Sequence, residues 1–391
     1  MRFLYVGLEP VTFDSELYRQ SVLLKFGGVR QLGNLVDYIC YDQQKILSCV
    51  NGEISETSLT EKPSKEKQFD NYVLDFLKGQ TYDFVYMRGL ILNPAHLKIA
   101  KSVKTKKFGA KVIYEPRCYP EKEHLKEMLQ DCREKCGMKE YAELQKKVLR
   151  HRMCLASLAN VVDTVVIYEC PVNFVWGVPA IAVNNGIAVG QIKVRSTFEE
   201  LGTPIKMLGI VDDLKINGYD RLFRGMNAYR HNRRREEISL DIVGSDEKTK
   251  ELKKMAAKWN VEQFVNFVGE KTLPEINELC NTHTIAVSNL GLFRSGRIYD
   301  SPRMTRLFCA AGIPFLYAYE DVGLGVKVPF AMKIPNIDAS VSMELVGEFV
   351  WRCRLNTRLA QQERRFAEDN YDWRVIMKKI LDFAATGKLE V

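Results

Sequence analysis

The sequence predicts an α/β fold with two domains, each built around a mainly parallel β-sheet. Short apolar runs alternate with amphipathic stretches of about a dozen residues, as expected for βαβ units. Several runs, such as 161–168, are apolar almost without interruption, which is typical of parallel strands buried on both faces. The alternation begins at residue 2 and begins again at residue 205, so two sheets are expected.

The first domain is predicted from the elements between residues 2 and 184. It opens with the apolar run 2–7, which ends at Gly7, and continues with a helical stretch over 15–35. The polar segment 51–67 is expected to be a loop. The remaining strands are expected at 36–42, 46–50, 82–87, 111–115, 161–168 and 181–184, with helices at 94–105 and 122–158.

The second domain is predicted from the renewed alternation. Its strands are expected at 205–211, 238–244, 264–269, 284–288 and 313–319, and its helices at 219–230, 247–259, 273–280 and 302–311. The chain after about residue 340 is mostly helical. Because the polar stretch 194–202 separates the two patterns, the predicted domains are 1–197 and 198–370, followed by a last helix over 371–391.

The composition predicts a globular protein without a membrane span or a metal centre. Of the 391 residues, 46% are apolar and 27% are charged, which is enough to bury a core. The first apolar run is too short for a signal peptide, and no run approaches the ~18 residues of a membrane helix. We therefore expect a cytoplasmic protein. The ten cysteines form no CxxC pair or Cys/His cluster, which favours reduced thiols and no metal.

Two absent motifs argue against common nucleotide-binding enzymes. The segment VGLEPVTF at the end of the first strand is not a G-x-G-x-x-G fingerprint, and no Walker motif is present. A simple dehydrogenase and a P-loop enzyme are therefore not expected. The net charge of +8 permits an anionic ligand or a membrane surface. The basic run 231–237 indicates a solvated turn, and no nucleic-acid partner is expected.

The segment 291–315 is the best candidate for a phosphate site. It follows a buried strand, carries Arg294 and Arg297 in a glycine-containing loop, and enters a helix through Asp300-Ser301-Pro302. An Asp or Ser cap with Pro at the first helical position is a strong helix start. The free N–H groups of such a start bind anions, and arginines can add charged hydrogen bonds. A purely structural cap with solvated arginines is the alternative, and the residues alone leave both open.

Two further places carry candidate residues. A second helix start follows the strand 205–211 at Asn217 and Gly218, with Lys215 and Arg221 nearby, although an ordinary cap explains it equally well. The segment 114–124 follows a strand and carries Glu115, Arg117 and His124. A carboxylate or histidine at a strand end can act as a general base or bind a sugar. An exposed histidine without a role is the alternative for His124.

The chain also resembles bacterial family 4 glycosyltransferases, the group 1 glycosyltransferases, over nearly its whole length. The resemblance is closest to members that build cell-surface polysaccharides. The order and spacing of the matching stretches are specific, although no single stretch is decisive. These stretches are YDFVYMRG (82–89), VIYEPRCYPEKE (112–123), VWGVPAIAVNNGIAV (175–189), NGYDRLFRGMNAY (217–229), LDIVGS (240–245), VNFVGEKTLPEINEL (265–279), SNLGLFRSG (288–296), SPRMTRLFCAAGIPF (301–315) and YDWRVIMKKI (371–380).

The resemblance implies the GT-B architecture, in which two Rossmann-like domains face each other across a cleft. The C-terminal helices, including 371–391, would pack back toward the N-terminal domain. A UDP- or GDP-linked sugar would be held by the C-terminal domain, and an acceptor by the N-terminal one. The sugar would be transferred with retention of configuration, without a metal or a permanently bound cofactor. The developing charge on the leaving nucleotide would be stabilised by helix N-termini and cations.

The motifs and the resemblance together give the candidate site residues. Those expected to bind the donor are Gly7, Lys215, Asn217, Gly218, Gly244, Arg294, Tyr299, Asp300, Ser301, Pro302 and Leu307. Those expected to take part in catalysis are Arg294, Glu115 and Arg117, and those expected to bind the acceptor are Arg88, Tyr119 and His124. No metal ligand is expected.

The sequence departs from the family at its acidic positions. The family's Glu-x7-Glu pair falls on Tyr299 and Leu307, and Asp300 is the nearest substitute. The usual diphosphate-binding Arg and Lys fall near Asp212 and Asn217, so Arg294 and Lys215 would replace them.

These departures leave three hypotheses. The first is an active, divergent glycosyltransferase, and the second is an inactive GT-B protein that acts as a partner or scaffold for another transferase. The third is a nucleotide-sugar epimerase of the same fold, which the C-terminal match disfavours. The acceptor is expected to be a glycan or lipid-linked glycan at the inner membrane face. The lysine-rich stretch 98–111 would meet anionic lipids there, or would simply be a solvated helix face.

Overall fold

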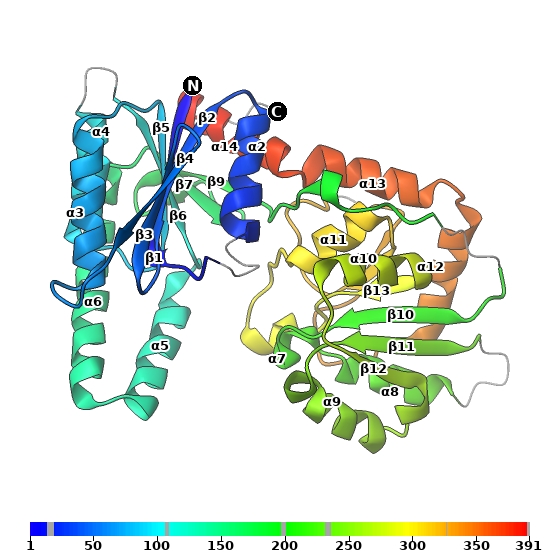
Figure 1. Cartoon of the computed structure of the whole chain (residues 1–391). Coiled ribbons are helices and arrows are strands. Elements are labelled where there is room, and N and C mark those ends of the chain that lie inside the picture. The colour runs from blue at the N-terminus through cyan, green and yellow to red at the C-terminus, as the bar shows by residue number, and fades with distance from the viewer. Residues whose placement is uncertain (14–18, 106–108, 197–200, 231–235, 326, 389–391) are drawn as a thin grey trace. The chain divides into compact units, whose positions relative to one another are not determined.

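Figure 1 shows the computed structural model of the chain, which describes residues 1–13, 19–105, 109–196, 201–230, 236–325 and 327–388. The chain forms two compact units. Unit 1 consists of Met1–Val183 together with Trp373–Val391, and unit 2 consists of Asn184–Asp372. The domain boundary predicted at 197/198 lies outside the described residues, and the units divide earlier, at 183/184. The last helix, predicted over 371–391, belongs to unit 1.

Unit 1 contains a nine-stranded sheet in the order β4-β3-β2-β1-β5-β6-β7-β9-β8. The six central strands from β2 to β9 pair in parallel, whereas β3, β4 and β8 pair antiparallel. The strands are β1 (Arg2–Pro10), β2 (Leu35–Tyr41), β3 (Lys45–Val50), β4 (Glu53–Ser58), β5 (Phe84–Gly89), β6 (Lys111–Pro116), β7 (Thr164–Tyr168), β8 (Phe174–Val175) and β9 (Val178–Val183).

Helices cover both faces of this sheet. One hydrophobic cluster joins the sheet to α3 (Lys65–Lys78), α4 (Pro94–Lys104) and α6 (Met138–Ala156). A second cluster joins the other face to α2 (Lys25–Gln31) and α14 (Trp373–Thr386), which pack on each other as Figure 1 shows. A π-helical turn (Arg19–Leu24) precedes α2, and a 3₁₀ turn (Leu158–Asn160) follows α6. The unit therefore completes its core with a helix from the far end of the sequence.

Unit 2 contains a six-stranded sheet, entirely parallel, in the order β12-β11-β10-β13-β14-β15. Clusters of buried residues lie on both faces. The strands are β10 (Ile205–Ile210), β11 (Ile238–Val243), β12 (Val265–Gly269), β13 (Ile285–Val287), β14 (Phe315–Tyr317) and β15 (Ala331–Lys333). The helices are α7 (Leu214–Asn217), α8 (Asp220–Tyr229), α9 (Asp246–Lys258), α10 (Leu273–Thr282), α11 (Arg303–Ala311), α12 (Met343–Leu355) and α13 (Leu359–Asn370).

The structure corrects three predicted elements of unit 1. The predicted loop 51–67 contains the strand β4, whose residues are all exposed, so no buried side chain marked it in the sequence. The predicted single helix 122–158 is divided at Gly137 into α5 (Glu121–Lys135) and α6, which pack on each other. The first strand does not end at Gly7 but continues to Pro10. The start of the helix predicted over 15–35 lies partly outside the described residues.

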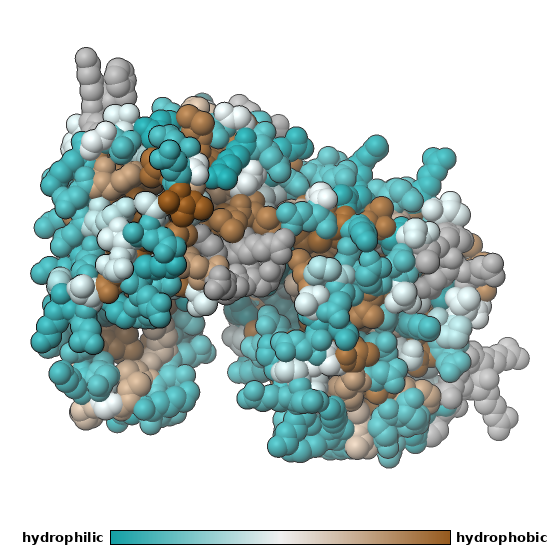
Figure 2. All heavy atoms as spheres, in the orientation of Figure 1, coloured by the Kyte–Doolittle hydropathy of each residue, from teal (hydrophilic) through white to brown (hydrophobic). Residues whose placement is uncertain are grey.

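No helix in the described part of the chain is both long enough and apolar enough to span a membrane. Hydrophilic residues cover most of the face of each unit that is visible in Figure 2.

Candidate functional site

Two loops of unit 2 cross closely at the carboxyl ends of β10 and β13. Gly218 ends α7 with a φ of 64°, and a Cβ on it would lie 2.6 Å from the amide nitrogen of Gly291. The Gly291 N–H donates to the Ile216 carbonyl at 2.8 Å, and the Leu290 N–H donates to the Asn217 carbonyl at 3.1 Å. The structure thus brings together the two segments that the sequence singled out separately, 215–218 and 291–301.

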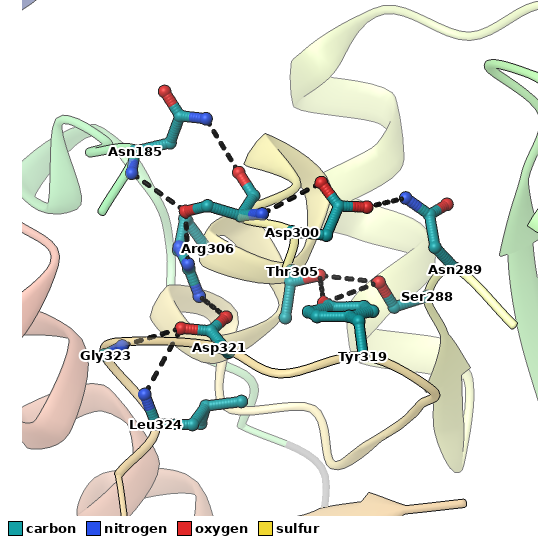
Figure 3. Close-up of polar contacts among 11 residues, drawn as sticks. Asn185, Ser288, Asn289, Asp300, Thr305, Arg306, Tyr319, Asp321, Gly323 and Leu324 are labelled. Atoms are coloured by element: carbon teal, nitrogen blue, oxygen red, sulfur yellow. Dashed lines mark hydrogen bonds and ion pairs between the residues drawn. The ribbon is translucent and has the colours of Figure 1, made fainter. Parts of the chain in front are cut away.

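A chain of side-chain hydrogen bonds joins these loops to the start of α11. The Asn217 side chain accepts from the Asp212 N–H at 3.0 Å and donates to the Asn289 side-chain oxygen at 2.9 Å. Asn289 in turn donates to Asp300 at 2.7 Å, as Figure 3 shows. Asp300 is buried, and this burial raises the pKa of its carboxyl group. Asn217 and Asp300 therefore fix the geometry of the loops through contacts within the protein.

Arg294 lies in the 3₁₀ turn Leu292–Ser295, next to the start of α8. Its guanidinium donates to Asp220 at 2.7 Å and to the Lys215 carbonyl at 3.4 Å, with about a quarter of the side chain exposed. Lys215 is exposed. A surface hollow beside Arg294 is lined by charged and apolar residues, among them Lys215, Asp220, Arg224, Lys258 and Trp259. Arg294 can therefore reach a ligand only by sharing or leaving Asp220.

The start of α11 differs from the predicted cap. The helix begins at Arg303, Pro302 occupies the N-cap position, and no side chain caps the helix. Asp300 instead accepts from the Ser301 N–H at 2.9 Å. Among the described residues, neither the Arg303 nor the Met304 amide has a hydrogen-bond acceptor. These two amides can bind an anion at the positive end of the helix.

Below these amides, a fully buried arginine holds Ser301 in place. Arg306 donates to the Ser301 hydroxyl at 2.5 Å and to the carboxylate of Asp321 at 2.6 Å. Asn185 binds the same serine twice, through its backbone N–H to the hydroxyl at 2.9 Å and through its side chain to the carbonyl at 2.7 Å. Figure 3 shows these contacts together with the buried hydroxyl cluster of Ser288, Thr305 and Tyr319.

Ser301 and Arg306 also contact residues close to the two points at which the chain passes from one unit to the other. Asn185 follows the first passage, at 183/184, and Tyr371 precedes the second, at 372/373. The Arg306 guanidinium lies 4.1 Å from the centre of the Tyr371 ring. The Ile187 N–H donates to the Tyr371 carbonyl at 2.8 Å. Arg306 was not among the predicted site residues, although a lone charge directly before the apolar helical run 307–311 is a signal of a buried, paired group.

The remaining predicted donor residues are placed unevenly. Leu307 is fully buried in the hydrophobic core, so its predicted contact with the donor is wrong. Tyr299 is half-buried and pairs with Glu320 in an isolated β-bridge. Gly244 is buried, and a Cβ there would lie 3.1 Å from Val211. Gly7 belongs to unit 1, where it lies within β1 opposite Arg88 of β5.

Glu115, predicted to be catalytic, is buried at the carboxyl end of β6 in unit 1. One carboxylate oxygen accepts from the Lys25 ammonium and the Tyr86 hydroxyl, and the other accepts from Arg88 Nε at 2.8 Å. Although burial opposes it, these cations hold the pKa of Glu115 below its usual value. A general base must accept a proton from a ligand that can reach it. Since Glu115 is buried and both of its carboxylate oxygens are bound by protein side chains, it is not placed for that role in this structure.

The other predicted residues of unit 1 lie nearer the surface. Arg117 is half-exposed, with its guanidinium 3.6 Å from the Glu9 carboxylate. Tyr119 packs edge-on against the Trp176 ring, with 5.9 Å between the ring centres. His124 lies in the first turn of α5 and is half-buried. Arg88, Glu115 and Arg117 therefore gather at the carboxyl edge of this sheet.

One cluster of possible metal ligands occurs among the described residues, formed by Glu66, Asp70 and His96. His96 Nδ1 accepts from the Asn93 N–H at 3.2 Å, and His96 Nε2 lies 3.2 Å from Asp70 Oδ1. The Asn93 side chain donates to both carboxylates at 2.9 Å. These contacts cap α4 and hold it against α3.

Comparison of the sequence with protein-family models and with curated proteins found no match. Solved structures do match over the full chain. HepE from Anabaena, in complex with UDP, has a TM-score of 0.60 at 13% identity, covering 99% of this chain and 100% of that one. The lipopolysaccharide outer core galactosyltransferase WaaB has a TM-score of 0.58 at 14% identity, covering 100% of both.

The chain has the GT-B fold. A glycosyltransferase from Rickettsia africae gives the same result, with a TM-score of 0.58 at 12% identity over 98% of this chain and 97% of that one. The expected two-domain α/β architecture of this fold is confirmed. At identities this low, the likeness shows the fold alone, and the activity has to be argued from the residues.

Proposed function

We propose that the protein is a glycosyltransferase that moves a sugar from a nucleotide diphosphate sugar to a glycan or lipid-linked acceptor. The observation that carries the proposal is the pair of amides at the start of α11, those of Arg303 and Met304, which have no hydrogen-bond acceptor in the part of the chain that the structure describes. They lie beyond the carboxyl edge of a parallel sheet in a GT-B fold, where ligands of open α/β sheets bind. HepE, of the same fold, was solved with UDP.

The leaving group would be the nucleoside diphosphate. As the bond between the sugar and the diphosphate breaks, negative charge grows on the phosphate oxygen. The amides of Arg303 and Met304 and the guanidinium of Arg294 would stabilise that charge without a metal. Retention of configuration at the sugar is part of the proposal, as in the family that the sequence resembles.

The test is binding followed by turnover. The purified protein is heated with UDP, GDP and other nucleoside diphosphates, and binding is expected to raise the melting temperature with UDP or GDP. A panel of nucleotide sugars is then screened for slow release of free nucleotide. No thermal response to any nucleotide would contradict the proposed donor site.

A partner or scaffold without turnover is the second candidate, and a specific observation favours it. Leu307 and Tyr299 have no carboxyl group, and the carboxylate of Asp300 is buried and bound by Asn289, so none of the three presents a free carboxylate to a donor. Nucleotide binding without release of nucleotide from any sugar donor would support this candidate over the transferase.

The acceptor is proposed to lie at the cytoplasmic face of a membrane, with α4 as the contact. Lys98 and Lys101 on α4 are exposed, whereas Lys104 forms an ion pair with Asp163 at 3.0 Å. Lys106 and Lys107, in the same stretch, lie outside the described residues. Flotation with vesicles tests the contact, because binding should require anionic lipid and should weaken when Lys98 and Lys101 are replaced by Gln. Binding independent of lipid charge would contradict it.

A further inference from the structure

Arg88 is the one side chain of the buried Glu115 cluster that reaches the surface. The Lys25 and Glu115 side chains are 2% and 5% exposed, whereas that of Arg88 is 21% exposed. Arg88 uses only Nε toward Glu115. Among the described residues, its terminal nitrogens Nη1 and Nη2 have no hydrogen-bond partner. The guanidinium is therefore fixed along one edge and open along the other.

The groups behind Arg88 fix it firmly. The other oxygen of Glu115 accepts from Lys25 and from Tyr86, so the carboxylate is bound at both ends. The Lys25 ammonium lies 4.8 to 5.7 Å from the ring centres of Tyr86, Tyr168, Trp373 and Phe26. Burying two opposite charges in this way brings little net stability. Its clearest effect here is to hold one edge of a guanidinium in a single orientation.

The neighbouring charges do not occupy Arg88. Glu9, the other acid at this edge, accepts from the Leu90 N–H at 2.5 Å and lies 3.6 Å from Arg117. Tyr5, which also faces Arg88, stays protonated because burial raises its pKa. Lys25 and Arg88 share the single carboxylate of Glu115, so this group of three side chains carries one net positive charge. An anion at the terminal nitrogens of Arg88 would neutralise that excess.

We propose that Arg88 binds an oxyanion of the acceptor, a phosphate or a carboxylate, through Nη1 and Nη2. A guanidinium with two parallel N–H groups matches the spacing of two oxygens on such a group. The inference rests on the proposed function, since it gives unit 1 the acceptor, and it narrows the acceptor to an anionic glycan or a glycan on a lipid phosphate. A neutral glycan would offer no anionic oxygens to the terminal nitrogens Nη1 and Nη2 of Arg88.

The experiment measures arginine reactivity in the wild-type protein. Phenylglyoxal modifies accessible guanidinium groups, and peptide mapping by mass spectrometry gives the rate at each arginine. Methyl phosphate, glucuronate and methyl glucoside are added separately at constant ionic strength. Methyl phosphate or glucuronate is expected to slow the modification of Arg88 about tenfold at saturation. Arg117, at the same edge and half-exposed, is the internal control and should react at an unchanged rate.

Each outcome separates the proposals. Protection by methyl phosphate alone indicates a lipid phosphate acceptor, and protection by glucuronate indicates an acidic sugar. Equal rates for Arg88 in all three solutions, or equal protection of Arg88 and Arg117, would overturn the inference. In a parallel sample with UDP, the modification rates of Arg294 and Arg303 are measured. If UDP does not slow the modification of these two arginines, the result counts against the donor site and not against the role of Arg88.

Discussion

Arg306 and Asp321 form an ion pair in which neither side chain has any surface exposed to solvent, with 2.6 Å between Nη1 and Oδ2. The second oxygen of Asp321 accepts from the Gly323 N–H at 2.8 Å and from the Leu324 N–H at 3.3 Å. The pair thus ties α11 to the loop that follows β14. The same guanidinium donates to the hydroxyl of Ser301, two residues before the Arg303 amide of the proposed phosphate site.

Removing one member of this pair should strongly destabilise unit 2. Arg306→Met leaves Asp321 buried and charged without its partner, and should lower the free energy of unfolding by about 3–5 kcal/mol. Urea unfolding of the variant measures this loss. The control is Lys126→Met, which removes an exposed pair with Glu123 and should change stability little. A similar fall in the free energy of unfolding in the two variants would show that the buried pair contributes no more to stability than the exposed one.

A second prediction concerns Glu363 on α13, which is fully buried. Neither of its carboxylate oxygens has a hydrogen-bond partner among the described residues, and burial raises its pKa well above the usual value. The folded state therefore keeps a proton that the unfolded state loses near pH 4.3. The free energy of unfolding should consequently fall as the pH rises above that value toward the raised pKa.

Glu363→Gln removes this titration. Compared with the wild type, the variant should be more stable at pH 7 and should lose less stability between pH 5 and pH 8, as urea unfolding at several pH values would measure. Glu368→Gln, on an exposed part of the same helix, is the matched control. Parallel pH curves for wild type and Glu363→Gln would rule out a protonated Glu363.

Gly218 tests the loop crossing. Gly218→Ala forces an alanine to a φ of 64° and places its Cβ 2.6 Å from the Gly291 nitrogen, so the loops must separate. The left-handed conformation alone costs about 1–2 kcal/mol, and the overlap adds to it. Gly269→Ala is the control in the same unit, because Gly269 has a φ of 76° and open space around it. A thermal melt should show a clearly larger loss for Gly218→Ala.

Arg294 tests the donor site. If its guanidinium stabilises the leaving diphosphate, Arg294→Gln should slow the release of nucleotide from a sugar donor by roughly 10- to 100-fold, the value of about 1.5–3 kcal/mol for a charged hydrogen bond. The reaction is followed as free nucleotide under saturating donor. Lys253→Gln, which breaks an exposed pair with Asp246 on α9, should leave the rate unchanged. An unchanged rate in Arg294→Gln would remove this residue from the site.

The sequence predicted the parallel cores well, because a buried strand leaves an uninterrupted apolar run and a helix leaves a polar face. The prediction failed for elements whose side chains show no such hydrophobic pattern. The strand β4 is entirely exposed and is defined by its backbone pairing with β3. The break at Gly137 divides a charged stretch whose two helices, α5 and α6, both expose most of their residues.

The candidate site was predicted in part. The residues Lys215, Asn217, Gly218 and Arg294 do lie at one edge of the sheet, since they follow parallel strands. Their partners Asp220 and Asn289 were not predictable, because these residues contact Arg294 and Asn217 only after the loops fold. For Glu115, the sequence predicted a catalytic role because its partner in the fold could not be seen. A carboxylate at a strand end suggested a base, and only the fold reveals Lys25, ninety positions away in the sequence, bound to it.

The split of unit 1 along the chain has a consequence for its synthesis. Trp373, Ile376, Met377 and Ile380 of α14 fill the core beside Phe26, yet they are translated after the whole of unit 2. While the ribosome synthesises unit 2, α14 does not yet exist. The apolar side chains on the sheet face that α14 later covers therefore stay exposed during that time. Chains released before residue 373 would keep that face bare, and we expect them to aggregate or to be bound by chaperones.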